Sequence, residues 1–332
     1  HFGVDAVAEV IRQGFRFADR HDRLSLRFSL VSDLIREAGY WARKENHAFV
    51  TRTDVEAAVA HKRHRSNLAE QWIQDEIREG TLMVDLDKEV VGQVNGLSVH
   101  QLGDYAFGRP IRITARTSVG TKGVIDIQRE AELAGNVHSK GVMTLAGYLT
   151  GKFAGVYPFA LSASLTFEQT YSEVEGDSAA VGELAAILSS LAALPIRQWL
   201  AVTGSVNQLG EVQPIGGVNE KIEGFFESCV RRGLTGKQGV IIPTRNTKHL
   251  ALRRDVVEAV ESGQFTIYGV NRIEEAIELL TGVPAGERGL DGEFAPDTVY
   301  GRAAQRLAEL AQAIAEWSEG ETKQDGRIIT EL

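Results

Sequence analysis

Apolar side chains in the first 66 residues recur at steps of three and four positions, the period of a helix that buries one face. Val4, Val7 and Ile11 begin one such series, and Thr53 with Asp54 is typical of the first turn of another helix. A short extended piece separates the second helix from the third. The pattern predicts helices over about 4–18, 25–44, from 53 onward and 67–79.

The pattern changes at Thr81, where short apolar runs between Gly, Asp and Pro residues predict strands. Helices and strands then alternate, which favours an α+β or α/β fold with some parallel pairing. The predicted strands are 81–84, 93–100, 111–118, 123–128, 160–167, 199–203, 239–242 and 266–270. The predicted helices are 139–149, 177–194, 218–232, 256–261, 273–280 and 303–317, followed by a polar tail.

Composition and charge support a division of the chain. Its 332 residues suggest about two domains. Residues 1–66 hold 12 Lys and Arg against 9 Asp and Glu, a formal net charge of +3. Since the whole chain has a net charge of −9, the remainder carries −12. We expect a helical domain at 1–66, a linker helix at 67–80, a mixed α/β domain at 81–282, and a linker and helix at 283–332.

The sequence disfavours several classes of function. The basic excess at the N-terminus is too sparse for a nucleic-acid footprint, and no apolar run is long enough to cross a membrane. A single cysteine, Cys229, suits a reducing cytoplasm. The chain begins with His1 rather than Met, so we expect it to be part of a longer protein.

Familiar catalytic motifs are missing from the sequence. No phosphate loop, Gly-x-Gly-x-x-Gly fingerprint, His-Glu-x-x-His zinc motif or Gly-x-Ser-x-Gly elbow occurs. We therefore expect no nucleotide hydrolysis by this chain alone and no metal site. No histidine has a sequence context that pairs it with a nucleophile, so a Ser-His-Asp triad lacks support.

Ser178 is the first candidate for chemistry. It lies in the segment 175–179 (EGDSA), at the predicted start of an apolar helix. Free backbone N–H groups and the helix dipole at such a position suit a nucleophile whose intermediate carries an oxyanion. The alternative is that Asp177 or Ser178 simply caps the helix.

Lys221 is the second candidate, near the start of a predicted helix that follows the turn 213–217 (QPIGG). A helix N-terminus disfavours a cation, and burial lowers the pKa of a lysine further. A neutral amine can take a proton from serine without any histidine. The alternative is a solvated surface lysine beside Glu220.

Taken together, these blocks resemble the proteolytic domain of the Lon protease family. The matching segments are 94–99 (VNGLSV), 137–142 (VHSKGV), 175–179 (EGDSA), 202–206 (VTGSV), 214–221 (PIGGVNEK) and 239–243 (GVIIP). The resemblance covers about residues 80–282. The absence of a proline before the serine is similar to the B-type branch.

The resemblance implies roles for individual residues. Ser178 matches the nucleophile and Lys221 the general base of a Ser-Lys dyad, and Thr203 matches the hydroxyl that orients the lysine. Glu175 falls where this branch carries an acidic residue, which either pairs with the lysine in a resting state or only shapes the loop. Backbone N–H groups around Asp177 are expected to help form the oxyanion hole. Residues 167–169 are a candidate edge strand for binding an extended peptide.

The N-terminal region resembles the helical lid of an AAA+ ATPase, within which Arg27 is a candidate to approach a nucleotide's phosphates. The implied protein is an ATP-dependent Lon-like serine protease that cleaves unfolded or damaged polypeptides in protein quality control. It is expected to be a cytoplasmic homo-hexamer, with ATP and Mg bound by an ATPase core outside these residues. Peptide hydrolysis itself needs no metal or other cofactor. The alternative is a non-catalytic binding or scaffold module with the same fold.

Overall fold

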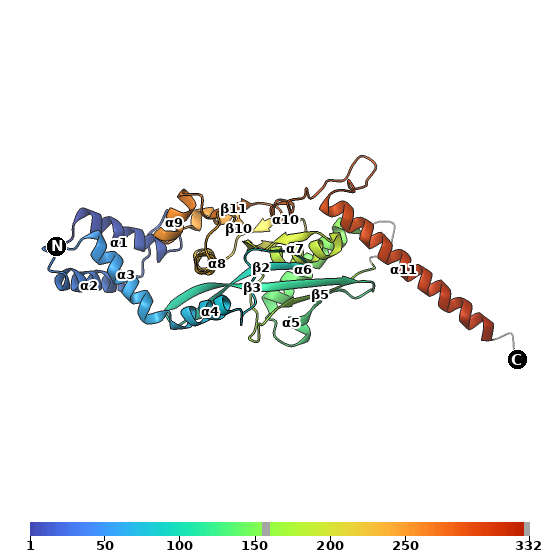
Figure 1. Cartoon of the computed structure of the whole chain (residues 1–332), viewed down its shortest axis with the longest axis horizontal. Helices are drawn as coiled ribbons and strands as arrows, with labels where there is room; N and C mark the ends of the chain where they lie inside the picture. Colours follow the sequence, from blue (N-terminus) through green and yellow to red (C-terminus); the bar gives the residue numbers. More distant parts are fainter. Residues whose placement is uncertain (155–159, 329–332) are drawn as a thin grey trace.

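The computed structural model describes residues 1–154 and 160–328. A helical N-terminal region lies at one end of an elongated molecule, a mixed sheet with helices on both faces forms the middle, and one long helix leaves the opposite end (Figure 1). The predicted fold class, a small all-helical region followed by a mixed α/β domain, is confirmed.

Three helices of the N-terminal region enclose a small core of their own, which includes Ala6, Ala38 and Val55. The third helix starts one residue before the predicted Thr53. Thr51 occupies the N-cap, and its backbone N–H donates to the Asp54 carboxylate at 2.8 Å. These helices are α1 (Val4–Arg16), α2 (Phe28–Lys44) and α3 (Arg52–Ser66).

A seven-stranded mixed sheet forms the middle of the molecule, in the order β11-β10-β7-β2-β3-β5-β4. The pairs β2–β3 and β3–β5 are antiparallel, and the other neighbours run parallel. Its strands are β2 (Gln93–Leu102), β3 (Tyr105–Ser118), β4 (Gly123–Asp126), β5 (Ser162–Phe167), β7 (Leu200–Val202), β10 (Gly239–Pro243) and β11 (Thr266–Val270). Two small antiparallel pairs join β1 (Glu89–Val91) to β6 (Pro195–Arg197) and β8 (Ser205–Val206) to β9 (Val212–Gln213).

The β2–β3 hairpin is longer than the sequence predicted. The strand expected to begin at Ile111 begins at Tyr105, because the whole of β2 pairs with residues 105–114 of β3 and the hairpin closes with Leu102 opposite Tyr105. Gly103 in the intervening two-residue turn has a φ of +61°, a left-handed conformation that glycine adopts without strain.

The predicted strand at 81–84 is wrong. This segment is irregular, and a side chain occupies its backbone groups in place of a neighbouring strand. The Gln169 amide donates to the Thr81 carbonyl at 2.8 Å and accepts from the Met83 N–H at 2.7 Å. An amide side chain can thus replace a strand partner, which periodicity does not reveal.

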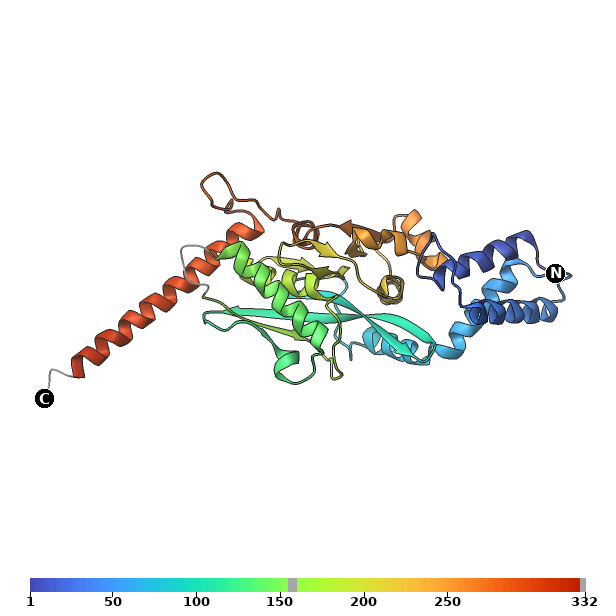
Figure 2. The ribbon, with the colours of Figure 1, turned by 180° about the vertical axis from the view of Figure 1, so that it is seen from behind.

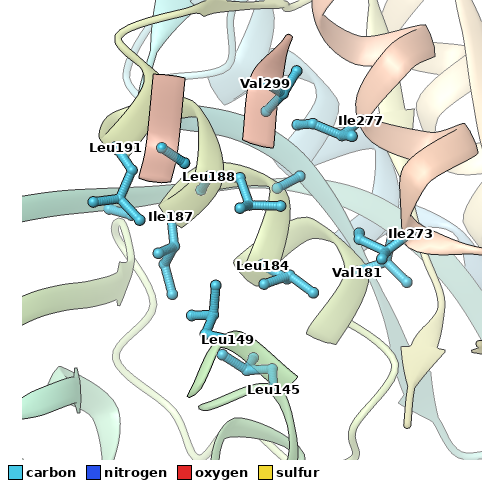
Figure 3. Close-up of a cluster of buried hydrophobic side chains, with 14 of the residues drawn as sticks. Leu145, Leu149, Val181, Leu184, Ile187, Leu188, Leu191, Ile273, Ile277 and Val299 are labelled. Carbon is cyan, nitrogen blue, oxygen red and sulfur yellow. The ribbon is translucent and has the colours of Figure 1, made fainter. Parts of the chain in front are cut away.

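Helices cover both faces of the sheet. One face carries α6 (Asn136–Phe153), α7 (Ala180–Ala192), α10 (Ile273–Thr281) and α11 (Val299–Ile328), and α6 crosses that face in the view from behind (Figure 2). Figure 3 shows side chains of α7 packed between those of α6 and α10. The other face carries α4 (Leu68–Glu79), α8 (Val218–Arg232) and α9 (Arg254–Glu261). Short α5 (Ile127–Glu130) and the 3₁₀ helix η1 (Thr244–His249) complete the elements.

The C-terminal segment packs into the same core as α7. Val299 and Tyr300 are fully buried there, and the Tyr300 hydroxyl lies 2.8 Å from that of Tyr148 on α6. The helix predicted at 303–317 runs instead from Val299 to Ile328, so the expected polar tail is helical over much of its length. The last four residues of that tail lie outside the described part. None of the described helices is long and apolar enough to cross a bilayer.

Candidate active site

Ser178 lies in the loop that leads into α7. The helix predicted from Asp177 begins at Ala180, and Ala179 is its N-cap. Neither Asp177 nor Ser178 makes a side-chain capping bond, so the capping interpretation is wrong. Tertiary contacts hold the serine outside the helix: its carbonyl accepts from the Gly204 N–H at 2.7 Å.

Lys221 lies on the fourth residue of α8. Gly217 forms the N-cap of this helix with a φ of +66° and turns the chain into it. The lysine side chain is buried at 3% exposure, so the interpretation as a solvated surface lysine is wrong. Its Nζ lies 2.7 Å from Ser178 Oγ and 3.1 Å from Thr203 Oγ1.

The pKa of Lys221 falls from 10.5 to about 8 because burial penalises the charged amine. The negative charges of Asp177 and Glu220 oppose this shift and keep the pKa from falling further. A lysine in this range is partly neutral near physiological pH, and a neutral amine 2.7 Å from a serine hydroxyl can accept its proton.

Thr203 connects the two candidates. It follows β7, is fully buried, and its hydroxyl accepts from Lys221 Nζ while donating to the Ser178 carbonyl at 3.0 Å. The same side chain therefore orients the lysine and fixes the backbone of the serine. The structure brings Ser178, Lys221 and Thr203 together from three separate segments of the chain.

The two acidic residues of the loop have different surroundings. Among the described residues, no ion pair within 4 Å joins Glu175 to Lys221; Glu175 is exposed, and its carboxylate lies where a side chain on Gly135 would stand. That position fits the loop-shaping alternative. Asp177 accepts from the Ser205 hydroxyl at 2.8 Å. Ser205 was missed at the level of sequence, since nothing in its spacing marks it as a partner of the loop.

The backbone at the start of α7 offers free donors. In residues 1–154 and 160–328, the N–H groups of Asp177, Ser178 and Ala179 have no acceptor. They flank the serine at the positive end of the α7 dipole. Donors placed this way suit an oxyanion that forms beside Ser178 Oγ.

A buried ionisable cluster lies beneath the same loop. His138 Nε2 is 3.3 Å from Asp126 Oδ2, and His138 Nδ1 is 3.7 Å from Glu183 Oε1. Burial lowers the pKa of His138, but the two carboxylates and the backbone of Gly176 outweigh it and raise that pKa. Burial raises the pKa of Glu183 to about 7. The cluster therefore ties β4, α6 and α7 to the serine loop.

The candidate edge strand at 167–169 is not open. The Gln128 amide accepts from the Phe167 N–H at 3.2 Å and donates to its carbonyl at 3.4 Å. The Glu168 N–H donates to the Arg112 carbonyl, and the Gln169 side chain holds the irregular segment near Thr81. The expectation of a peptide-binding edge at these residues is wrong.

Ser178 and Lys221 line a cleft of about 1420 Å³ between the sheet and the N-terminal helices. At one wall of the cleft, the Arg16 guanidinium of α1 donates to the Glu223 carboxylate of α8 at 2.7 and 3.1 Å. Arg27 also lines the cleft, exposed at the N-cap of α2, and its expected approach to a nucleotide stays a prediction. Among the described residues, no group of three or more His, Cys, Asp or Glu side chains could hold a metal ion.

Comparison with known proteins agrees with this geometry. Residues 1–65 match the family model of the archaeal LonB AAA+ ATPase lid domain, and residues 172–282 match that of the Lon protease C-terminal proteolytic domain. The chain belongs to the Lon protease family. Both family resemblances seen in the sequence are thereby confirmed, and the second match contains Ser178, Thr203 and Lys221.

Relatives within the Lon family span bacteria and archaea. A putative Lon protease homolog of Escherichia coli K12 is 38% identical over 93% of this chain and 52% of its own length. One from Haemophilus influenzae is 47% identical over 65% of the chain and 36% of its own length. An archaeal Lon protease of Pyrococcus abyssi is 33% identical over 84% of the chain and 26% of its own length. The chain thus spans about half the length, or less, of these relatives.

Proposed function

We propose that this chain is the peptidase part of a serine endopeptidase that works through a Ser178–Lys221 dyad. The observation that carries the proposal is the 2.7 Å separation between Lys221 Nζ and Ser178 Oγ in a buried setting that lowers the lysine pKa to about 8. Thr203 acts as a positioning residue for the amine.

The chemistry follows from these contacts. Neutral Lys221 takes the hydroxyl proton as Ser178 Oγ bonds to the peptide carbonyl carbon, and the N–H groups of Asp177 to Ala179 stabilise the oxyanion. The lysine ammonium then gives its proton to the leaving nitrogen as the C–N bond breaks. Lys221 then takes a proton from water as the water oxygen bonds to the acyl carbon, and it returns that proton to Ser178 Oγ as the ester bond breaks.

The whole protein is proposed to be an ATP-dependent homo-hexamer that degrades unfolded or damaged polypeptides in cytoplasmic quality control. The match of residues 1–65 to an AAA+ lid supports ATP use, with ATP and Mg held by residues outside this chain. We propose domains at 1–66 and 81–282, joined by the helix within 67–80. The packing of residues 283–317 against α7 supports treating the C-terminal segment as part of the proteolytic unit.

Hydrolysis of a fluorogenic unstructured peptide tests the dyad. Ser178→Ala and Lys221→Met should abolish cleavage, and Thr203→Val should weaken it. Ser262→Ala and Lys248→Met, at exposed positions away from the cleft, serve as matched controls and should retain it. Labelling by a fluorophosphonate should vanish in Ser178→Ala.

Equal cleavage by all these variants would exclude the Ser-Lys mechanism. If the folded parent chain neither cleaves nor labels, whether it is monomeric or assembled, the non-catalytic binding module becomes the better account. Sedimentation velocity gives the oligomeric state of each sample, so that monomeric and assembled parent chains are tested separately.

A further inference from the structure

Three polar groups on one face of the β2–β3 hairpin lack hydrogen-bond partners within the described residues. Ser98 Oγ, His100 Nε2 and Arg109 Nε are buried, and none has a hydrogen-bond partner in the described part of the chain. Ser98 lies opposite Arg109, and His100 lies opposite Phe107, with which its ring stacks at 5.5 Å. Side chains alternate along a strand, so Ser98, His100 and Arg109 share one face of the hairpin.

That face leads to the candidate dyad. Further along β3, Thr117 bonds to Ser190 near the C-terminal end of α7, and Ile113 lies beside Gly182 near its beginning. Inward-facing residues of β3 thus follow α7 towards its N-terminus. Arg109 is the second inward position beyond Ile113, so it faces the space at the N-terminus of α7, and it lines the same cleft as Ser178.

Arg109 also lacks a counter-charge. Two other arginines on the cleft wall have carboxylate partners: Arg16 pairs with Glu223 at 2.7 Å, and Arg63 pairs with Glu70 at 2.9 Å. Among the described residues, no carboxylate lies within 4 Å of Arg109, and its burial lowers its pKa with no acidic group opposing the shift.

His100 adds an uncharged donor or acceptor. Burial lowers its pKa, and the positive charge of Arg109 lowers it further, so the imidazole is neutral at physiological pH. A buried donor without an acceptor is costly, and the cost is recovered when a ligand supplies one. The planar guanidinium fork matches a carboxylate, which it binds through two parallel hydrogen bonds.

We propose that Ser98, His100 and Arg109 form a subsite for a carboxylate of the peptide substrate. The carboxylate comes either from an Asp or Glu side chain near the scissile bond or from the C-terminus of the peptide. The inference rests on the proposed peptidase function, since it assigns a substrate preference to the same cleft.

Matched peptides test the subsite in the 332-residue chain. One series carries Glu or Gln at each position flanking the scissile bond, and a second has a free or an amidated C-terminus. The parent chain should favour the carboxylate form in kcat/KM by about tenfold to a hundredfold, the range for a charge-assisted hydrogen bond. The series that shows the preference identifies the source of the carboxylate.

Three variants assign the preference to Arg109. Arg109→Gln should bring the carboxylate-to-amide ratio close to one, and Arg109→Lys should restore part of it, because it keeps the charge but loses the fork. Arg116→Gln is the matched control: it removes an exposed arginine from the same strand and should leave the ratio unchanged. An unaltered ratio in Arg109→Gln would overturn the inference.

Binding separates this inference from the proposed function. Fluorescence anisotropy of the same peptides on a Ser178→Ala chain measures the preference without cleavage. If the carboxylate peptide binds preferentially, Arg109→Gln removes that preference and the parent chain hydrolyses neither peptide, then the peptidase proposal is refuted and the subsite is supported. If the parent chain hydrolyses both peptide forms at equal rates, the peptidase proposal is supported and the subsite is refuted. A changed oligomeric state in Arg109→Gln, with an equal loss on both peptides, would place the carboxylate on another subunit and also refute the subsite.

Discussion

The pH dependence of serine acylation follows from the burial of Lys221. Its pKa falls from 10.5 to about 8, and only the neutral amine can accept the Ser178 proton. The neutral fraction is about one tenth at pH 7, one half at pH 8 and nine tenths at pH 9. The acylation rate should therefore rise about tenfold between pH 7 and pH 9 and level off above.

An exposed lysine would give a different profile. With a pKa of 10.5, the neutral fraction rises about a hundredfold between pH 7 and pH 9 and keeps rising beyond. The difference between the two pKa values corresponds to about 3 kcal/mol in favour of the neutral amine. The slope between pH 7 and pH 9 therefore measures the effect of burial directly.

Fluorophosphonate labelling from pH 6 to pH 10, followed by stopped flow, gives the acylation rate without a titrating substrate. Lys221→Met is the control and should show only a slow, nearly flat background. A hundredfold rise with no plateau by pH 9.5, or a flat profile in the parent chain, would refute the assignment of Lys221 as a buried general base.

Four further outcomes are expected. Glu220→Gln should move the acylation midpoint below that of the parent, because the charge of Glu220 raises the pKa of Lys221; an upward shift in the same assay would contradict this. The folded-state pKa of Lys221 is depressed, so its destabilising effect is present at pH 7 and disappears as the pH rises from about 8 to 10.5. In denaturant titration, Lys221→Met should therefore raise the free energy of unfolding by about 3 kcal/mol more at pH 7 than at pH 10.5. An equal increase at both pH values would contradict a depressed lysine pKa. Gly108→Ala should lower stability by about 2–3 kcal/mol in thermal melts and slow acylation, whereas Gly39→Ala, with open space around it, should be neutral or stabilising. His138 has a folded-state pKa above 6.5, so its contribution is complete below pH 6.5 and is lost as pH rises through that pKa; His138→Gln should cost more stability at pH 6 than at pH 9.

Local sequence signals predicted the elements that depend on local interactions. The helix over 218–232 has the predicted bounds, because Gly217 and Gly233 flank an amphipathic stretch. The strand over 266–270 also matches. In both cases the start and stop residues are encoded next to the element itself.

The start of α7 could not be predicted in this way. The sequence from Asp177 onward suits a helix, but the Ser178 carbonyl is taken by the Gly204 N–H and the Thr203 hydroxyl, which are distant in sequence. These contacts keep the serine out of the helix. The pairing of Ser178 with Lys221, 43 residues apart, likewise came from family resemblance rather than from spacing.

The polar groups of the β2–β3 hairpin were missed for a related reason. Ser98, His100 and Arg109 are unremarkable in sequence, and the predicted strand began at Ile111, beyond Arg109. Only the full register of the hairpin places them on one face. Local periodicity cannot reveal that a side chain lacks a partner, because this depends on residues that are distant in the sequence.

Gly108 of β3 and Gly224 of α8 let the two backbones touch, which positions Lys221 of α8 beside Ser178. A Cβ on Gly108 would lie 2.0 Å from the Glu220 carbonyl oxygen, and one on Gly224 would lie 2.0 Å from that of Gly108. Backbone contact between β3 and α8 is possible only because both side chains are missing. On the outer side of the same helix, Glu223 binds Arg16 of α1. The helix that carries Lys221 is therefore fixed to the sheet on one side and joined to the N-terminal helices on the other, so a displacement of α1 must either break that ion pair or pull on the helix that carries the proposed base.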